Sequence, residues 1–166
     1  MTGPSADGFA TTKVRLMKTS DLDQVISIAL SLPEAPHWPQ SAYANALNPD
    51  STPRHIALVV VPAATDPAPS AALGFTVASL LPPQAELETI AVAKGSQRRG
   101  LGRQLFHALA GELQAVGAHE ILLEVRASNQ AALEFYRFLG FSETGLRPRY
   151  YADPQEDAVL MRLPLG

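Results

Sequence analysis

The stretch Gln97-Arg98-Arg99-Gly100-Leu101-Gly102 lies between an apolar run at 87–92, which is typical of a strand, and a long helical pattern that begins near Gly100. A strand, a turn of the form Gln/Arg-x-x-Gly-x-Gly and a helix form an arrangement suited to binding a pyrophosphate. The two glycines let the backbone approach an anion closely, and the N–H groups of the first helical turn, which lack partners inside the helix, point towards it. Arg98, Arg99 and Arg103 add positive charge. The sequence therefore predicts an anion-binding turn.

Two other phosphate-binding motifs do not fit the spacing of these glycines. A dinucleotide fingerprint needs a third glycine three residues after Gly102, where Leu105 stands. A Walker loop starting at Gly95 needs Lys and then Ser or Thr after Gly100, and that pair is missing. The remaining alternative is that the glycines only shape a tight connection between a strand and a helix.

Composition indicates a globular protein of ordinary type. The chain has 166 residues, of which 46% are hydrophobic and 17% charged, which predicts one domain at 11–166 preceded by a disordered leader at 1–10. A net charge of −3 argues against general nucleic-acid binding. The N-terminus shows no export signal and no run is long enough to span a membrane, so we expect a cytoplasmic protein with no membrane partner. The oligomeric state is left open.

The chain contains no cysteine, which excludes disulfides, cysteine metal sites and a cysteine nucleophile. Its histidines are scattered without the spacing of metal ligands, so we expect no metal site: His37, His55, His107 and His119.

The apolar pattern predicts a mixed α/β or α+β domain. Early hairpins precede one strand–helix–strand unit, in which the strands at 86–92 and 121–125 should run parallel. The helix between them ends at Gly117 and carries one apolar stripe, made of Leu101, Leu105, Leu109, Leu113 and Val116. The other predicted strands cover 13–17, 55–61, 72–81, 141–146 and 157–163, and the other helices begin at Ser20, at Gln40 and at Ser128 or Asn129.

The first helix is predicted to be capped by Ser20 and to bury one face, made of Leu22, Val25, Ile26, Ala29 and Leu30. The segment 33–39 that follows contains three prolines and is predicted to be an exposed loop. It also contains Trp38, which either lines a binding groove or plugs the edge of the core.

Several ordered motifs resemble one known family. They are ELETIAV at 86–92, QRRGLG at 97–102, LLEVRASNQAALEFYRFLGF at 122–141, RPRYY at 147–151 and EDAVLM at 156–161. In this order they resemble the Gcn5-related N-acetyltransferases (GNAT), and among these most the ribosomal-protein-alanine N-acetyltransferases of the RimI type. The resemblance covers about half the chain, from Glu86 to the C-terminus, whereas the N-terminal half matches only in the order of its elements.

The resemblance implies a mostly antiparallel sheet, flanked by helices, whose parallel fourth and fifth strands splay apart to hold acetyl-coenzyme A. Backbone groups of Ile90, Ala91 and Val92 would pair with the pantetheine arm as an added strand does. The residues of the turn that would hold the pyrophosphate are Arg98, Arg99, Gly100, Leu101, Gly102 and Arg103. Asn129 matches a position that contacts the cofactor; its other role is that of a helix N-cap, and both roles are compatible.

The resemblance also assigns the two proton transfers of a direct attack by an amine on the thioester. Glu124 matches the general base, although alternation along its strand also allows an outward-facing surface residue. Glu86 and Glu88 are rival bases on one face of the fourth strand. Tyr136 matches the general acid, since a phenol with a pKa near 10 can protonate a thiolate, although its helical spacing also suits a core aromatic residue.

An N-terminal amine suits this chemistry better than a lysine. The reference pKa is about 8 for an α-amine and about 10.4 for lysine, so far more of the former is uncharged at neutral pH. The resemblance implies the same acceptor, an N-terminal alanine of a small-subunit ribosomal protein that is basic in sequence. Tyr150 and Tyr151 would wall the peptide groove opposite Trp38, or simply pack in the closing hairpin. The alternative functions are acetylation of a small-molecule amine (a polyamine, an amino acid or an antibiotic) and a non-catalytic acyl-coenzyme A-binding module.

Overall fold

The computed structural model describes residues 11–63 and 71–166. The predicted leader at 1–10 therefore lies outside the described residues. In the part that is described, no helix is both long and apolar enough to cross a membrane.

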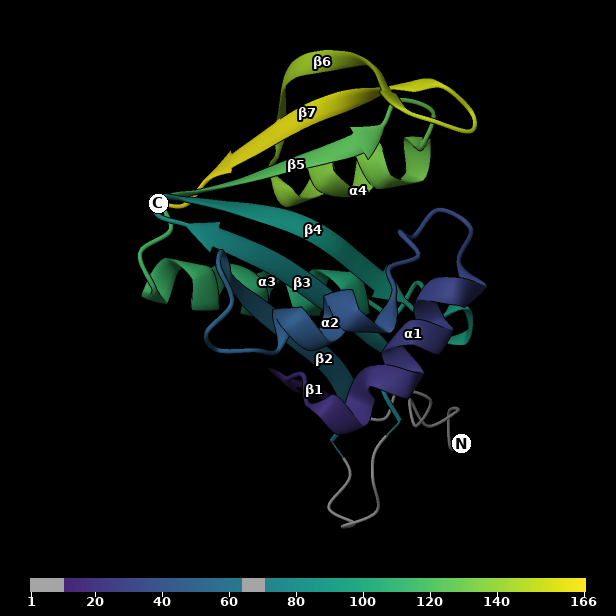
Figure 1. Cartoon of the computed structure of the whole chain (residues 1–166), viewed down its shortest axis with the longest axis vertical. Helices are drawn as coiled ribbons and strands as arrows, with labels where there is room; N and C mark the ends of the chain where they lie inside the picture. The colour runs from purple at the N-terminus through teal and green to yellow at the C-terminus, as the bar shows by residue number, and fades with distance from the viewer. Residues whose placement is uncertain (1–10, 64–70) are drawn as a thin grey trace, which may run out of the picture.

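A seven-stranded mixed sheet forms the centre of the molecule (Figure 1), with the order β1-β2-β3-β4-β5-β7-β6. Every neighbouring pair is antiparallel except β4 and β5, which are parallel. This confirms the predicted fold class. The strands are β1 Thr12–Leu16, β2 Arg54–Pro62, β3 Gly74–Leu81, β4 Gln84–Val92, β5 Glu120–Arg126, β6 Ser142–Tyr151 and β7 Glu156–Pro164.

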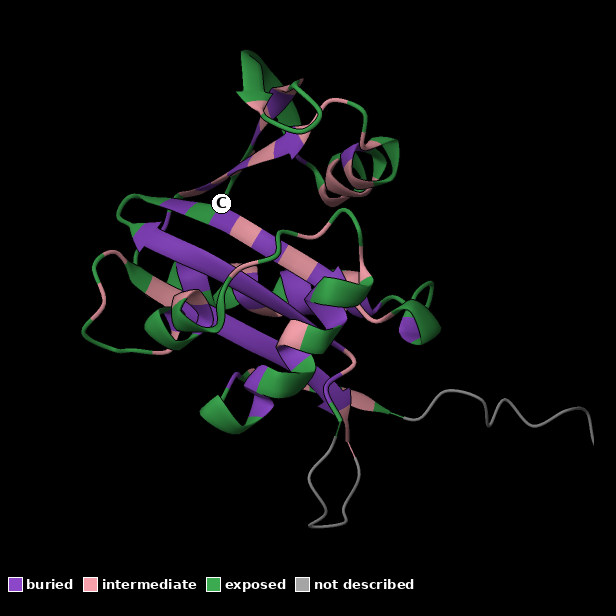
Figure 2. Ribbon diagram, turned by 45° about the vertical axis from the view of Figure 1, so that its right-hand side comes forward, coloured by how far each residue is buried: buried purple, intermediate pink, exposed green. Residues whose placement is uncertain are grey.

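Helices cover both faces of the sheet. The helices α1 (Leu22–Ser31) and α2 (Gln40–Ala46) share one core with alternate residues of β2 and β3, while α3 (Leu101–Ala115) and α4 (Gln130–Leu139) contribute to a second core. Two short 3₁₀ turns, at Thr19–Asp21 and Lys94–Ser96, precede α1 and α3. Figure 2 shows that β2 and β3 are mostly buried between these helices, that buried residues alternate along β4 with more exposed ones, and that the outer strand β6 is exposed.

The helix α3 forms as the sequence predicts. Leu101, Leu105, Leu109 and Leu113 recur at a spacing of four residues and are all buried, and burial of each side chain contributes about 2 kcal/mol. Phe106, which is not in the predicted stripe, is also buried, and Val116 lies at the C-cap only partly buried. Gly117 ends the helix with a φ of +100°, a backbone conformation that glycine adopts readily.

The prediction for the first helix is wrong in two details. Ser20 does not cap α1, because it lies inside the 3₁₀ turn and Asp21 occupies the N-cap position. Ile28 is buried in place of Leu30, which is 61% exposed. The 3₁₀ turn moves the start of α1 to Leu22, and packing in the core shared with β2 and β3 selects Ile28 over Leu30.

Asp21 ties this turn to β1. Its carboxylate accepts two hydrogen bonds from the Arg15 guanidinium, at 2.7 and 2.9 Å, and one from the Lys18 N–H at 2.8 Å. The hydrogen bonds from Arg15 are the main reason why the pKa of Asp21 is lowered, although burial opposes them. A lowered pKa means that the carboxylate stabilises the fold above its unfolded pKa, and that this stabilisation is lost as the pH falls through the folded pKa.

We expect Asp21→Asn to lower the free energy of unfolding by about 2 kcal/mol at pH 7, since hydrogen bonds to a charged group are lost. The difference from the unmodified chain should shrink below about pH 4, where the unfolded carboxyl is protonated. Urea denaturation at pH 7 and pH 3 measures the free energy of unfolding of the variant and of the unmodified chain, and thereby the difference at each pH. Asp23→Asn, at an exposed position of α1, is the control; an equal loss in both variants would contradict the role of Asp21.

The closing strands are longer than predicted, and the structure adds their order in the sheet. β6 continues through the RPRYY segment to Tyr151 instead of ending at 146, and β7 lies between β5 and β6 in the sheet. As a result, side chains of β6 reach β5 only across β7. This places the end of β6 beside the site described next.

Candidate active site

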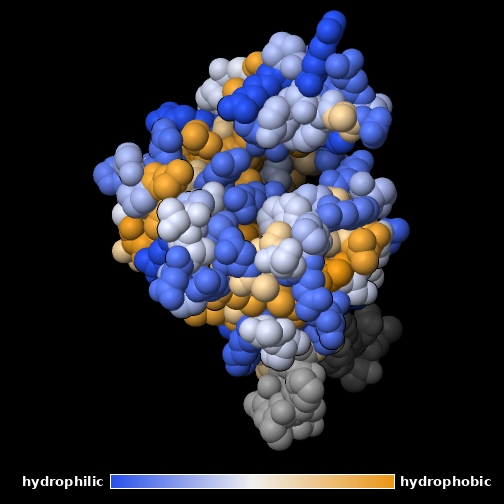
Figure 3. Space-filling model, in the orientation of Figure 1, coloured by the Kyte–Doolittle hydropathy of each residue, from blue (hydrophilic) through white to orange (hydrophobic). Residues whose placement is uncertain are grey.

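The parallel strands β4 and β5 part shortly after they begin. They pair at Gln84↔Glu120, Ala85↔Ile121 and Glu86↔Leu122, and beyond Glu86 no pairing between them is recorded among the described residues. From there β4 stays with β3 and β5 stays with β7. Figure 1 shows the strands diverging, and Figure 3 shows a hollow in the surface between the upper layer (α4, β5, β6 and β7) and the rest. The splay implied by the resemblance is confirmed.

A β-bulge accompanies the divergence. Val77 of β3 pairs with Thr89, but the next residue, Ala78, pairs with Leu87, so Glu88 is an extra residue on β4. A bulge of this kind bends its strand and redirects a side chain. The bulge lies two residues beyond the last pair with β5, where β4 turns away from it.

The far half of β4 turns part of its backbone towards the gap. The Ala93 N–H donates to the Leu73 carbonyl at 2.8 Å on the β3 side. Because hydrogen-bonding direction alternates along an antiparallel ladder, Ala91 also faces β3, whereas the peptide groups of Ile90 and Val92 face the gap. Of the three predicted pantetheine contacts, Ile90 and Val92 thus have the required orientation, and Ala91 does not.

The Gly-rich turn follows directly on this strand. Gly100 has a φ of +76° and is the N-cap of α3, with no side-chain hydrogen bond capping the helix. The first N–H group bonded within the helix is that of Gln104, which donates to the Gly100 carbonyl at 3.0 Å. The N–H groups of residues 101–103 are therefore available to an anion at the positive end of the helix dipole. Gln97 fastens the turn to β4 by donating to the Val92 carbonyl at 3.1 Å.

The second glycine permits close packing. A Cβ atom built at Gly102 would lie 3.2 Å from the Cζ atom of Phe135 on α4, so even an alanine would require the Phe135 ring to shift by a few tenths of an ångström. A Cβ atom at Gly100 meets nothing within 4 Å. The two glycines thus have different roles: Gly102 allows helix contact, and Gly100 allows the left-handed turn beside open space.

The basic side chains lie around the turn. Arg98 and Arg99 are exposed, and Arg98 has a φ of +64°. Arg103 donates to the His107 Nε2 atom at 3.3 Å, and its guanidinium lies 5.4 Å from the centre of the Phe138 ring. The positive charge is therefore placed where the sequence analysis expects a pyrophosphate.

We expect Gly100→Leu to weaken binding of coenzyme A about 10-fold or more, because a left-handed φ costs a branched residue roughly 1–2 kcal/mol and its side chain would occupy the space beside the turn. Isothermal titration calorimetry measures the affinity. Gly117→Leu is the matched control, since Gly117 also has a positive φ and open surroundings but ends α3. If both variants lose stability but keep their affinity, the turn does not bind the cofactor.

Tyr136 of α4 belongs to an aromatic cluster. Its ring centre lies 5.6 Å from that of Phe135 and 5.7 Å from that of Phe141. Burial raises the pKa of Tyr136 to about 12, and the nearby Tyr151 adds to this effect. Among the described residues, no hydrogen-bond partner of the Tyr136 hydroxyl is recorded, so the group is available to a bound molecule. The predicted core role and an acid role are compatible here.

Glu124 of β5 lies on the face of the strand that the sequence predicts, with its side chain 19% exposed. Its carboxylate pairs with Arg147, which reaches over β7 from β6, at a distance of 3.3 Å. The hydrogen bond with Glu124 is the main reason why the pKa of Tyr150 is raised. Arg147 also lies 5.5 Å from the centre of the Tyr150 ring. The sequence analysis did not include Arg147 among the site residues, although it begins the RPRYY motif.

Glu86 and Glu88 lie at the same point of the gap. The pKa of Glu86 is raised by desolvation first and then by repulsion from Glu124 and Glu88, while Arg147 opposes the rise. Because Glu86 is repelled by both Glu124 and Glu88, the base predicted on β5 lies within electrostatic range of its rivals on β4. We call Glu86, Glu88 and Glu124 the acidic cluster. The structure brings together the three candidate bases.

The remaining predicted residues surround the gap. The Tyr150 and Tyr151 rings lie 5.0 Å apart at the end of β6, and Arg126 lies 4.4 Å from the Tyr151 ring centre. Asn129 caps α4 by accepting from the Ala132 N–H at 3.1 Å. Trp38 packs against Tyr43, with 5.2 Å between the ring centres, and is partly buried. The α1–α2 loop that carries it lies towards the open end of the gap (Figure 1).

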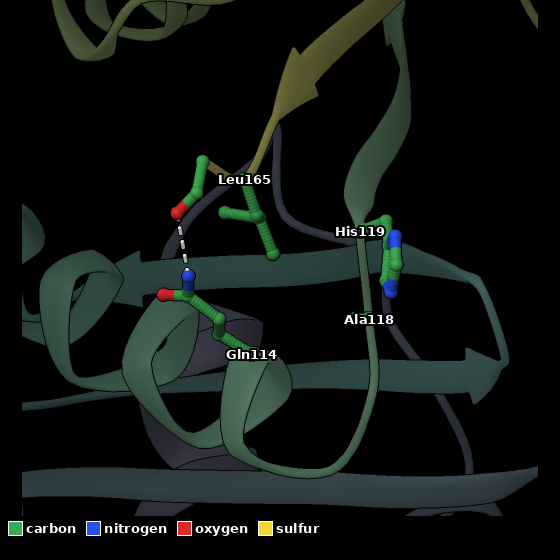
Figure 4. Close-up of a pocket in the computed structure, with 5 residues that line it drawn as sticks. Gln114, Ala118, His119 and Leu165 are labelled. Atoms are coloured by element: carbon green, nitrogen blue, oxygen red, sulfur yellow. Dashed lines mark hydrogen bonds between the residues drawn. The ribbon is translucent and has the colours of Figure 1, made fainter.

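A separate depression lies at the closed end of the two strands (Figure 4). It is lined by Gln114, Ala118, His119, Leu165 and Gly166, and none of the predicted site residues is among them. The His119 N–H donates to the Pro83 carbonyl at 2.7 Å, which places this depression where β4 and β5 begin. Among the described residues, no three or more His, Asp or Glu side chains are arranged so that they could hold a metal ion.

The parted strands and the Gly-rich turn define an acyltransferase fold, and the chain belongs to the GNAT family: the sequence model described as "Acetyltransferase (GNAT) family" matches residues 23–141. An N-alpha-acetyltransferase from Sulfurisphaera tokodaii is 34% identical over 158 residues, covering 92% of this chain and 93% of that protein. The crystal structure of the ribosomal-protein-S18-alanine N-acetyltransferase from Escherichia coli has a TM-score of 0.77 at 32% identity, covering 94% of this chain and 95% of that one.

The similarity is higher over a shorter segment in a third relative. The [ribosomal protein bS18]-alanine N-acetyltransferase of Salmonella typhimurium is 45% identical over 94 residues, which cover 55% of this chain and 64% of that protein. This match therefore spans less than two thirds of the relative's length.

Proposed function

We propose that this protein transfers the acetyl group of acetyl-coenzyme A to the N-terminal α-amine of a protein in a ternary complex. The observation that carries the proposal is the parting of β4 and β5 beyond the Glu86↔Leu122 pair, with the Gly-rich turn on one side and an acidic cluster at the apex. One mouth of the gap suits an anionic cofactor and the other a cationic amine. The chain contains no cysteine, which excludes an acyl-cysteine intermediate and fits direct attack.

For the cofactor, the residues present fit an extended ligand that ends in phosphates. Ile90 and Val92 offer peptide groups to the pantetheine arm, and the N–H groups of residues 101–103, with Arg98, Arg99 and Arg103, hold the pyrophosphate. Bound acetyl-coenzyme A supplies the activated acetyl group. Asn129, at the start of α4, contacts the cofactor while it caps the helix.

For the acceptor, the charges favour a basic peptide. The cluster of Glu86, Glu88 and Glu124 contains three carboxylates against one arginine, Arg147, while His55 lies 3.7 Å from Glu88. An ammonium group is attracted to these carboxylates. The attraction offsets part of the free energy that the ammonium group loses when it leaves water. Tyr150, Tyr151 and Trp38 form the walls of the peptide groove.

Two side chains carry the proton transfers. Glu124 takes a proton from the attacking amine, and Tyr136 donates one to the departing thiolate. With its pKa at about 12, Tyr136 is fully protonated at neutral pH. An ordinary thiol has a pKa of about 8.5, which is lower than the pKa of Tyr136. The apolar surroundings that raise the pKa of Tyr136 also raise the pKa of a thiol that leaves beside it, so the two pKa values are closer in the site.

The acceptor we propose is an N-terminal alanine of a small-subunit ribosomal protein, in the cytoplasm. The names of the Escherichia coli and Salmonella relatives support this choice, as does the acidity of the cluster, because ribosomal proteins are basic. The acetylation of a small-molecule amine is the competing function.

Mass spectrometry and thiol release on three acceptors test the proposal. The acceptors are a basic peptide that begins with alanine, the same peptide with a blocked α-amine and an internal lysine, and a polyamine. We expect acetylation of the free α-amine at the highest kcat/KM. A preference for the polyamine would replace the protein acceptor by a small molecule, and cofactor binding without thiol release from any acceptor would indicate a binding module.

A further inference from the structure

His55, the second residue of β2, joins the acidic cluster to the outside of the sheet. Its side chain is 10% exposed, and its Nε2 atom lies 3.7 Å from the Glu88 carboxylate, an ion-pair distance. Its Nδ1 atom lies 3.3 Å from the hydroxyl of Ser51, in the loop between α2 and β2. Both ring nitrogens therefore have a partner, one on each side.

The hydrogen bonds of Ser51 favour one tautomer of His55. The Ser51 hydroxyl donates to the Pro53 carbonyl at 3.1 Å, so its oxygen is free to accept from an N–H at Nδ1 of His55. In that tautomer the lone pair of Nε2 faces Glu88. A proton that arrives from Glu88 at Nε2 can thus be matched by one that leaves from Nδ1 to the Ser51 oxygen. The Ser51 hydroxyl, which is partly exposed, then turns away from the Pro53 carbonyl and releases its own proton to solvent.

The sheet holds these groups in a row. His55 of β2 pairs with Ser79 of β3, which pairs with Glu86 of β4. Glu88, the extra residue of the bulge, lies beyond Glu86 and interacts electrostatically with it. The groups that face His55 are therefore Glu88 and Glu86 from β4, Ser79 from β3 and Ser51 from the loop.

The proposed reaction leaves one proton to be removed. The acceptor begins as an ammonium group with three protons and ends as an amide N–H with one, while the N–C bond forms and the C–S bond breaks. One of the two lost protons ends on the thiol through Tyr136, and the other must reach solvent. The Glu88 side chain is itself 27% exposed. In the proposed ternary complex the cofactor and the peptide would fill the two mouths of the gap and cover it, which leaves the side towards His55 for this proton.

We propose that Glu88, His55 and Ser51 form a relay that carries this proton from the acidic cluster to solvent. The inference rests on the proposed function. The Glu88–His55 distance of 3.7 Å is longer than a hydrogen bond, and it shortens on formation of the ternary complex, as catalytic contacts often do. His55 and Ser51 act through Glu88 and do not touch the substrate.

Two substitutions at His55 test the relay. His55→Gln keeps a side chain that bonds to Ser51 but cannot change its charge, and His55→Ala leaves space for imidazole. We expect kcat to fall about 10-fold in both, at the low end of the effects of acid–base groups, with KM unchanged for both substrates. Added imidazole should restore kcat in His55→Ala but not alter His55→Gln. His119→Ala, at the closed end of the strands, is the control and should behave as the unmodified protein.

The outcomes separate the relay from a structural role and from the proposed function. Full activity of His55→Gln, or a loss in His55→Ala that imidazole does not reverse, would overturn the relay. Thermal melting of each variant shows whether a loss of activity is due to unfolding. If a His55 variant does not fold, Ser51→Ala is tested in its place. A kcat of Ser51→Ala equal to that of the unmodified protein then overturns the relay. If the unmodified protein itself acetylates no peptide, the proposed function fails and not the relay alone.

Discussion

Replacing Tyr136 with phenylalanine is expected to lower kcat about 10³-fold, within the range of a general acid, and to leave the affinity for acetyl-coenzyme A nearly unchanged. The substitution keeps the ring and therefore its packing against Phe135 and Phe141. It removes only a hydroxyl that has no recorded partner among the described residues. Single-turnover kinetics measure the chemical step, and calorimetry measures the affinity.

Tyr43→Phe is the matched control for this substitution. The Tyr43 ring is 1% exposed in the core below Trp38, and its hydroxyl is buried without a hydrogen-bond partner among the described residues. Because a buried unpaired hydroxyl is unfavourable, its removal should leave the rate unchanged and not reduce stability. A rate for Tyr136→Phe equal to that of Tyr43→Phe would remove Tyr136 from the acid role.

Replacing Glu124 with glutamine is expected to lower kcat about 10²-fold, most strongly at neutral pH. At that pH most of the α-amine is protonated, so the rate depends on a group that accepts its proton. The amide has nearly the same shape as the carboxylate but cannot act as the base. A pH–rate profile of kcat measures the effect.

Glu120→Gln is the control for Glu124→Gln, because it also removes one negative charge from β5 but does not alter the proposed base. Glu120 lies on the same face of β5, but at its paired end, where it interacts with Arg162 and Gln84. We expect this variant to keep its activity. If the Glu124→Gln profile is unchanged while Glu86→Gln or Glu88→Gln abolishes activity, the base belongs to β4.

The parts of the candidate site that depend only on neighbouring residues could be predicted from the sequence. The leucine stripe of α3, the Gly-rich turn at Gly100 and the cap at Asn129 each depend on residues within a few positions of one another. The motifs added Glu124 and Tyr136 through the resemblance. Prediction failed at Ser20, because a 3₁₀ turn stabilised by Arg15 on another element decides where α1 begins. It failed at Leu30, because packing against the sheet selects Ile28 for the core.

Sequence alone thus determined the order of the elements, the helix that presents an anion site and the residue types capable of proton transfer, because these follow from periodicity and from local backbone chemistry. Only the tertiary structure decided which groups meet. The bulge at Glu88, the parting of β4 from β5 and the insertion of β7 before β6 place Arg147 on Glu124 and His55 beside Glu88. These contacts join residues far apart in the chain, and sheet pairing, which is not a local property, sets them.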